Sequence, residues 1–232
     1  LILSLSAVFT FTKQNENSIT YYNETNEHIV FIEDGKVMAQ LAITDALKQC
    51  DCAHIDIGAA GTAMRFLTAY FAAMPGVSLT LTGTQRMLCR PIKPLVDSLM
   101  QMDADITYLG EDGFPPLSIE GKRLRGGNIS IRGDISSQFI SALMMIGPTL
   151  KGGLNIQLLG KVVSRSYIDM TCEIMRHYGI EVKSDENLIA IPEQSYSAPD
   201  VFMVEADWSS ASYFYELVAL TDMQNIKLTG LF

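Results

Sequence analysis

A repeated order of hydrophobic patterns constrains the fold of this chain more than any other feature of its sequence. The unit from 54 to 121 begins with a short apolar strand. A helical pattern, a second strand, a second helical pattern and two strands joined by a turn follow it. The unit from 128 to 193 has the same order, and a third unit begins near residue 201. The sequence therefore predicts repeated βαβαββ units.

Turn residues and changes of period set the bounds of the elements expected in these units. The strands are expected at 54–58, 77–83, 105–110, 116–121, 128–133, 153–160, 180–184, 188–193, 201–207 and 225–232. The helices are expected at 61–74, 91–104, 136–150, 166–179 and 209–220.

The expected helix starts at Gly61, Ser136 and Ser209 are almost evenly spaced, so one earlier helix start would fall before Leu1. We therefore expect both ends of the chain to lie within a longer protein. The elements expected before the first complete unit are the end of a helix at 1–6, a strand at 18–23 and a helix at 36–50.

The expected fold class is α/β, with the helices inside and mixed sheets outside. Strands that alternate with helices favour parallel pairing, but each unit also contains two strands joined by a turn, which pair antiparallel. The segment FISALMMIG (139–147) has almost no polar face, and a helix that is apolar nearly all round is buried. This arrangement is the reverse of a doubly wound fold, in which helices cover a central sheet.

Composition and charge argue against several classes of function. The 232 residues are 48% hydrophobic and 19% charged, and the formal net charge of −9 disfavours binding to nucleic acids or anionic membranes. No apolar run in the sequence is long enough to span a membrane. Cys50 and Cys52 are separated by a single residue and no second pair follows, so we expect neither a metal site nor a disulfide scaffold. Reduced thiols in a cytoplasmic protein are the expected state.

Three hydrogen-bonding side chains, Ser136, Ser137 and Gln138, stand together at the start of an otherwise apolar helix. One serine at such a place is usually an N-cap, and this interpretation suffices for Ser136 or Ser209 taken singly. Three donors exceed what capping needs, and a helix N-terminus attracts anions. If the repeats are related by approximate rotation, their helix starts converge, and we expect a phosphorylated or carboxylated small molecule there.

Three further residues near the expected helix starts have two interpretations each. Gly61 either eases a tight strand-to-helix turn or lets the backbone approach a ligand closely. Arg86 and Arg90, in an expected loop, are either solvated or paired with Asp97 or Glu111, or they bind an anion bidentately.

Two other side chains have more conventional interpretations. Arg65 is expected to be a buried partner of an acid such as Asp207. Tyr167, at another helix start, is by itself expected to belong to the core.

Six motifs occur along the chain in an order that is typical of one enzyme family. They are AAGTAMRFLTA (59–69), LTGTQRMLCRPIKPLVDSL (81–99), GFPPL (113–117), ISSQFISALMM (135–145), VVSRSYIDMT (162–171) and EADWSSASYF (205–214). From about residue 54 onward the chain resembles the 5-enolpyruvylshikimate-3-phosphate (EPSP) synthases, or 3-phosphoshikimate 1-carboxyvinyltransferases, whereas 1–53 match only weakly.

The resemblance implies a fold of two lobes, each made of three βαβαββ units with the helices inside. Residues 1–205 would form the first lobe and residues 206–232 the beginning of the second. The implied reaction transfers the enolpyruvyl group of phosphoenolpyruvate to the 5-hydroxyl of shikimate 3-phosphate and releases phosphate, without metal or organic cofactor. It belongs to chorismate and aromatic amino acid biosynthesis and is the target of glyphosate. The full-length protein would be a cytoplasmic monomer.

The resemblance also assigns ligand-binding residues. Shikimate 3-phosphate would be bound by Ser136, Ser137, Gln138, Ser164 and Tyr167. Phosphoenolpyruvate would be bound by Gly61, Arg86 and Gln138. No catalytic acid or base is assigned in this chain, because the family's proton-transfer groups belong to the second lobe.

The sequence departs from the family pattern in two places. The family's first helix begins with a Ser-Lys-Ser motif that would precede Leu1, and Ala59 stands where the family commonly has Asn. We therefore expect the 232 residues alone to be inactive.

Two alternatives remain open at this point. One is a UDP-N-acetylglucosamine enolpyruvyl transferase, which shares the fold and the chemistry. It has a reactive cysteine several residues before an Arg-Pro pair, whereas Cys89 directly adjoins Arg90. The other is a non-catalytic repeat domain that binds anionic metabolites or a partner protein.

Overall fold

The computed structural model describes residues 10–15, 18–22, 28–33, 36–37, 53–197, 208–221 and 226–229. The chain divides into two compact units, Leu1–Ser197 and Ala198–Phe232, which are described separately.

The first complete repeat lies between 53 and 120 and forms a four-stranded mixed sheet. The sheet order is β5-β6-β8-β7, in which β5 and β6 are parallel and the other neighbours are antiparallel. Its elements are β5 (Ala53–Asp56), α3 (Gly61–Ala72), β6 (Ser78–Thr82), α4 (Gln85–Leu88), α5 (Lys93–Met100), β7 (Asp105–Tyr108) and β8 (Leu117–Glu120).

The second repeat follows the same order of elements and has the same sheet topology. Its sheet order is β9-β10-β12-β11, again with the first two strands parallel and the other neighbours antiparallel. The elements are β9 (Arg125–Arg132), α6 (Ser137–Ile146), the 3-10 turn η1 (Gly147–Thr149), β10 (Lys151–Leu159), α7 (Arg165–His177), β11 (Lys183–Ser184) and β12 (Leu188–Ile191). The mixed sheets expected from the sequence are therefore confirmed.

The repeat extends to the way in which the second helix of each unit ends. Asp103 (φ 67°) follows α5 and Gly179 (φ 81°) follows α7, both with left-handed backbone. The next amide then bonds back into the helix, from Ala104 N to Leu99 O (3.0 Å) and from Ile180 N to Met175 O (3.0 Å). A left-handed residue with this bond is a common helix stop, usually made by glycine. Asp103 is the non-glycine version in the first unit.

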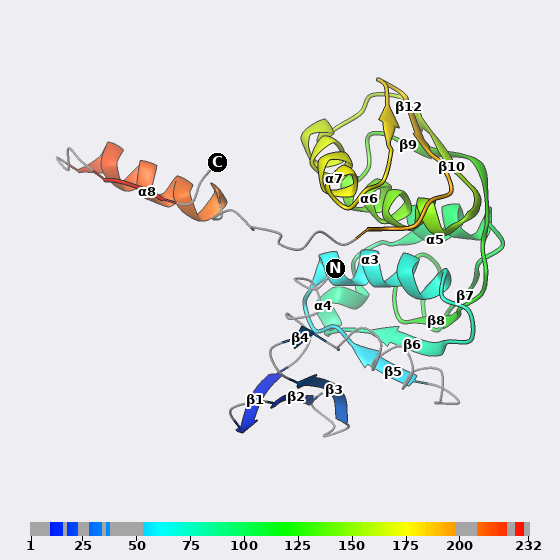
Figure 1. The fold of residues 1–232 in the computed structure, drawn as a ribbon, viewed down its shortest axis with the longest axis horizontal. Helices are drawn as coiled ribbons and strands as arrows, with labels where there is room; N and C mark the ends of the chain where they lie inside the picture. The colour runs from blue at the N-terminus through cyan, green and yellow to red at the C-terminus, as the bar shows by residue number, and fades with distance from the viewer. Residues whose placement is uncertain are drawn as a thin grey trace. The chain divides into compact units, whose positions relative to one another are not determined.

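The helices pack against one another and cover the inner faces of the two sheets (Figure 1). Every residue of α6 except Gln138 and Met145 is buried, as the apolar sequence of that helix predicts. In α3, only Thr62, Phe66 and Tyr70 escape full burial. The core therefore lies around α3 and α6, and the described strands between 53 and 191 form the outer layers.

The described strands of the N-terminal region depart from the expected unit. They are β1 (Thr10–Asn15), β2 (Ser18–Tyr22), β3 (His28–Glu33) and β4 (Lys36–Val37), which pair antiparallel in the order β1-β2-β3-β4. The strand expected at 18–23 is confirmed as β2, but the helix expected from residue 36 is wrong at its start, where β4 pairs with β3. The dipeptide Asp34-Gly35 between them is a hairpin turn signal that explains this pairing. The expected helix end at 1–6 and residues 38–50 lie outside the described residues.

The second unit contains α8 (Trp208–Leu220), which matches the helix expected at 209–220. The strand expected at 225–232 is not formed over the described residues 226–229, which have no regular secondary structure. A strand requires a neighbouring strand to take up its backbone hydrogen bonds, and 226–229 have no ladder partner in the described part of the chain. The strand expected at 201–207 lies outside it. Helices in the described ranges fall short of the length and hydrophobicity that crossing a bilayer requires.

Candidate anion-binding site

The turns that follow the parallel strands of each sheet lie side by side. In the first repeat, Thr84 N donates a hydrogen bond to Gly58 O (3.0 Å), and in the second, Val163 N donates to Gly133 O (2.9 Å). Parallel neighbours end at the same edge of their sheet, which is where open α/β sheets commonly bind ligands. The starts of α3 and α4 are therefore neighbours, and so are the starts of α6 and α7.

A side-chain bond joins the two repeats at the same end. Gln138 Nε2, in the first turn of α6, donates to Thr62 Oγ1 (2.9 Å), in the first turn of α3. Helices α3 and α6 also pack against each other along their length. The starts of α3, α6 and α7 therefore gather at one end of the helical core, and helix N-termini carry partial positive charge.

The polar residues at the start of α6 have two different roles. Ser136 is the N-cap, and its hydroxyl accepts a hydrogen bond from Gln138 N (3.4 Å), so the capping interpretation is confirmed for Ser136. Ser137 is the first helical residue, is 7% exposed and does not cap the helix. Gln138 is turned toward α3. Ser137 and Gln138 are thus the residues of this helix start that capping does not explain.

The start of α7 has an unusual backbone. Ser164 occupies the N-cap position with left-handed backbone (φ 59°, ψ 41°), and its hydroxyl makes no capping bond. Left-handed backbone in a residue other than glycine costs of order 1–3 kcal/mol, and at Ser164 no helix stop explains it, because a helix begins there. The exposed Ser164 hydroxyl is therefore presented at the end of the core where α6 also begins.

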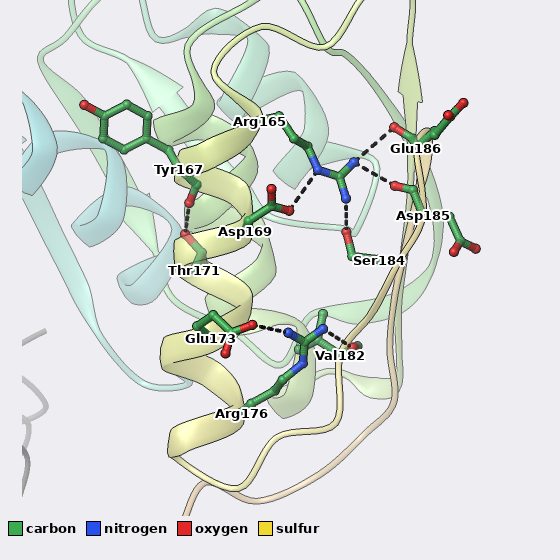
Figure 2. A network of polar contacts seen from close by, with 10 residues as sticks. All are labelled: Arg165, Tyr167, Asp169, Thr171, Glu173, Arg176, Val182, Ser184, Asp185 and Glu186. Carbon is green, nitrogen blue, oxygen red and sulfur yellow. Dashed lines mark hydrogen bonds and ion pairs between the residues drawn. The ribbon is translucent and has the colours of Figure 1, made fainter. Parts of the chain in front are cut away.

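Arg165 holds this helix start in place (Figure 2). Its guanidinium donates to Asp169 Oδ1 (2.9 Å), Asp185 O (2.7 Å) and Ser184 Oγ (2.8 Å), so that it ties the first turn of α7 to the turn between β11 and β12. The ring of Tyr167 points away from Arg165 (Figure 2), and Tyr167 is 58% exposed. The expectation that Tyr167 belongs to the core is therefore wrong, because the side of α7 that packs on α6 is formed by other residues.

Arg86 and Arg90 lie in and after α4, which replaces the loop expected from the sequence. Gln85–Leu88 form one helical turn, which Thr84 O closes by accepting a hydrogen bond from Leu88 N (3.1 Å). Both arginines are exposed. Neither forms an ion pair with the carboxylates of the described residues, and Asp97 pairs with Lys93 instead (3.4 Å).

Arg65 is buried in α3, as expected, with 5% of its surface exposed. Its Nη1 donates to Gly61 O (2.8 Å), and its guanidinium lies over the ring of Phe139 at 5.8 Å. Its Nε has no hydrogen-bond partner, and no described carboxylate pairs with it. Burial, and then the neighbouring charge of Arg90, lower the pKa of Arg65 to about 10. The expected partner Asp207 lies outside the described residues.

The described residues contain no group of His, Cys, Asp and Glu side chains that could hold a metal ion. Cys89 is exposed and Cys172 is buried, and both are free thiols, while Cys50 and Cys52 lie outside the described part. The chemistry available at the gathered helix starts is therefore that of hydroxyls, an amide, backbone N–H groups and guanidiniums. Such a set suits an oxyanion.

The structure brings the residues expected to bind ligands to this end of the core by three links. Gln138 reaches α3, Val163 brings the Ser164 turn beside α6, and Thr84 brings α4 beside Gly61. Thr62 was missed from the sequence, although it holds the same place in α3 as Gln138 holds in α6. Comparison of the two repeats position by position would have found it.

These features define a repeat protein of the α/β class, with its helices enclosed and its helix starts gathered at one end. The sequence profile of EPSP synthase (3-phosphoshikimate 1-carboxyvinyltransferase) matches residues 25–232, and the chain belongs to this family.

Curated relatives and solved structures agree with this assignment. A 3-phosphoshikimate 1-carboxyvinyltransferase of Bacteroides fragilis (strain YCH46) is 51% identical over 180 residues, which are 77% of this chain and 43% of the relative. The enzyme of the same name from Shewanella pealeana is 41% identical over 211 residues, 90% of this chain and 47% of the relative. The chain thus spans less than half the length of these relatives. An EPSP synthase structure from Acinetobacter baumannii has a similar fold, with a TM-score of 0.62 at 20% identity, over 92% of this chain and 42% of that one.

Proposed function

We propose that this chain forms the shikimate 3-phosphate-binding part of an enzyme that transfers the enolpyruvyl group of phosphoenolpyruvate to the 5-hydroxyl of shikimate 3-phosphate. The relatives that cover most of this chain carry the name of that activity. Both substrates are anions, which suits gathered helix starts in a chain whose net charge is otherwise negative. No cofactor is needed, because the enol phosphate is reactive once its methylene carbon is protonated.

In this proposal the two repeats bind different substrates. Shikimate 3-phosphate lies at the starts of α6 and α7, where it accepts hydrogen bonds from Ser136, Ser137, Gln138 and Ser164 and its ring packs on Tyr167. Phosphoenolpyruvate lies at the start of α3, beside Gly61 and Arg86. Gln138 contacts both ligands.

The single observation that carries this proposal is the bond between Gln138 Nε2 and Thr62 Oγ1 (2.9 Å). This bond joins Gln138, which the family resemblance assigns to both substrates, to the start of α3, which it assigns to phosphoenolpyruvate. Two reactants held at adjoining helix starts would be positioned for an intermolecular addition, and such positioning can supply about 7–11 kcal/mol of the barrier. The proton-transfer groups would come from a second lobe, because no carboxylate of the described residues lies among the ligand-binding groups named above.

The finer architecture belongs to the same proposal. Residues 1–205 would form one inside-out lobe that contains the two complete βαβαββ units, and residues 206–232, with α8, would begin the second. The closed enzyme would be a cytoplasmic monomer in which the two lobes exclude water from the reactants.

A chimera tests the proposed function. The matched 180-residue segment of the Bacteroides fragilis relative is replaced by the segment of this chain, and phosphate release from the two substrates is measured at saturation. We expect turnover of about one per second or faster, and loss of about a hundredfold or more in kcat/KM when Gln138 is changed to Ala. A folded chimera without turnover, beside an active relative, would show that this segment does not supply the substrate site. The matched control is Gln157→Ala, a polar change on the outer strand β10.

A further inference from the structure

The guanidinium of Arg90 lies against the first residue of α3. A Cβ atom built on Gly61 would stand 2.2 Å from Arg90 Nη1 and 2.8 Å from Arg65 Nη1. Both distances are far shorter than van der Waals contact. Arg90 therefore occupies the space that the missing side chain of Gly61 leaves open, beside a second guanidinium of the same sign.

The charges at this helix start are not balanced within the described residues. Elsewhere in the described chain, Arg125 pairs with Asp103, Arg132 with Asp134, Arg165 with Asp169 and Arg176 with Glu173. Arg65, Arg86, Arg90 and the exposed Arg123 form no ion pair with a described carboxylate. Two of these, Arg65 and Arg90, meet at Gly61, and Arg65 is 5% exposed with its Nε unpartnered.

Among the described residues, this arrangement favours a bound anion. Two like charges in contact repel, burial removes the water that would screen Arg65, and the partial positive charge of the α3 N-terminus adds to the repulsion. A bound anion reverses each of these contributions. The more negative the bound group, the larger the gain, because two full positive charges and a helix dipole act on it together.

We propose that Arg90, backed by the buried Arg65, determines the charge specificity of this site by selecting a dianionic tetrahedral group over a monoanionic one at the start of α3. The identification of that group with the phosphoryl group of phosphoenolpyruvate rests on the proposed function. A phosphate monoester, whose second pKa is about 6, is a dianion at pH 8. Arg90 can donate two parallel hydrogen bonds to such a group, and Gly61 offers its backbone without a side chain in the way.

Gly61 and Arg90 are therefore coupled. A methyl group at position 61 meets the far end of a flexible side chain and not the backbone, so Gly61→Ala displaces the Arg90 guanidinium from its place over the helix start. The change should weaken dianion binding through Arg90 as well as by filling space. In a chain that already carries Arg90→Met, Gly61→Ala should have a smaller effect on the binding of the dianion.

Two small anions of the same shape test the proposal on the 232-residue chain at pH 8. Methyl phosphate is the dianion and methyl sulfate the monoanion, and binding is followed by the NMR amide shifts of Gly61 and Thr62. We expect methyl phosphate to bind about tenfold tighter or more in the wild type, and Arg90→Met to remove most of this difference. Arg123→Met, which removes an exposed arginine between the two repeats, is the control and should leave the ratio unchanged.

Each outcome decides the matter. Equal affinities for the two anions in the wild type would overturn the proposal, as would a ratio that Arg90→Met leaves intact or an absence of saturable shifts with methyl phosphate. Arg90→Lys, which keeps the charge but not the two-pronged donor, should retain part of the preference if Arg90→Met is poorly folded. A selective site in a chain whose chimera is inactive would leave this inference standing without the proposed function. An active chimera with an unselective site would support the proposed function and overturn this inference.

Discussion

A buried pair of hydroxyls links α6 to α7 and allows a quantitative test of the helical core. Ser141 Oγ and Thr171 Oγ1 are 2.8 Å apart, and the two residues are 5% and 7% exposed. Thr171 Oγ1 also donates to Tyr167 O (2.8 Å), so its one proton is already used. Ser141 must therefore be the donor in the bond between the helices. The chain of bonds runs from α6 to the backbone of Tyr167 in the first turn of α7.

The expected energies follow from which group loses its partner. Ser141→Ala removes one donor and leaves Thr171 with its own bond, so the loss should be about 1 kcal/mol. Thr171→Val removes the acceptor and leaves the Ser141 proton in a dry interface, which costs about 1–3 kcal/mol. The double mutant places two apolar groups in contact and should be little worse than Thr171→Val alone. The interaction energy of the cycle should then be about 1 kcal/mol.

Urea unfolding followed by far-UV circular dichroism measures these differences. Thr68→Val is the matched control, because Thr68 is also buried and bonded to the carbonyl four residues earlier, Met64 O (2.7 Å), but its hydroxyl bonds no other helix. Combined with Ser141→Ala it should be additive within about 0.5 kcal/mol. Strict additivity of the Ser141 and Thr171 changes would refute the reasoning, because it would mean that this hydroxyl pair does not contribute to the contact between α6 and α7.

Four further predictions concern the ligand-binding residues and the two helices α6 and α8. In the active chimera, Gly61→Ala should raise the KM for phosphoenolpyruvate about tenfold or more and leave that for shikimate 3-phosphate nearly unchanged; equal effects on both would point to a stability defect. Ser136→Ala should lower the free energy of unfolding by about 1 kcal/mol because Ser136 caps α6. Ser137→Ala should chiefly weaken shikimate 3-phosphate binding in a calorimetric titration, and equal affinities would remove Ser137 from the site. Hydrogen exchange should be slower in α6 than in α8, where only Ala211 of residues 210–220 is buried.

The fold of 53–191 was predictable because each repeat carries strong local signals. The apolar runs of α3 and α6 require burial whatever their neighbours are, and the turn residues between β7 and β8 leave only antiparallel pairing. The two repeats have the same order of elements, so a boundary that is uncertain in one repeat can be placed from its counterpart in the other.

The failures of prediction have physical causes. The helical turn of α4 is too short to show a period. The antiparallel strands β1, β3 and β4 do not follow the order of elements in the later repeats, and Asp34-Gly35 is the local signal that marks a hairpin there. The strand expected at 225–232 depended on a pairing partner, which no local sequence supplies.

Individual residues of the candidate site were predictable from the sequence, but the contacts between them were not. Helix starts can be read from capping residues, and the family resemblance assigned Ser164 and Tyr167. The contact between Arg90 and Gly61 depends on how the turn after β6 packs beside the turn after β5. The unpaired state of Arg65 likewise depends on which acids the fold brings near, so neither feature could be derived from spacing along the chain.

The central claim is that the gathered starts of α6 and α7 bind shikimate 3-phosphate. A titration of the isotope-labelled 232-residue chain with this compound, followed by NMR amide shifts, tests it most directly. We expect the amides of Ser137, Gln138, Ser164 and Tyr167 to shift together and to saturate with one dissociation constant, at or below about 1 mM. Saturable shifts confined to other parts of the chain, or none at these four residues up to about 10 mM, would contradict it.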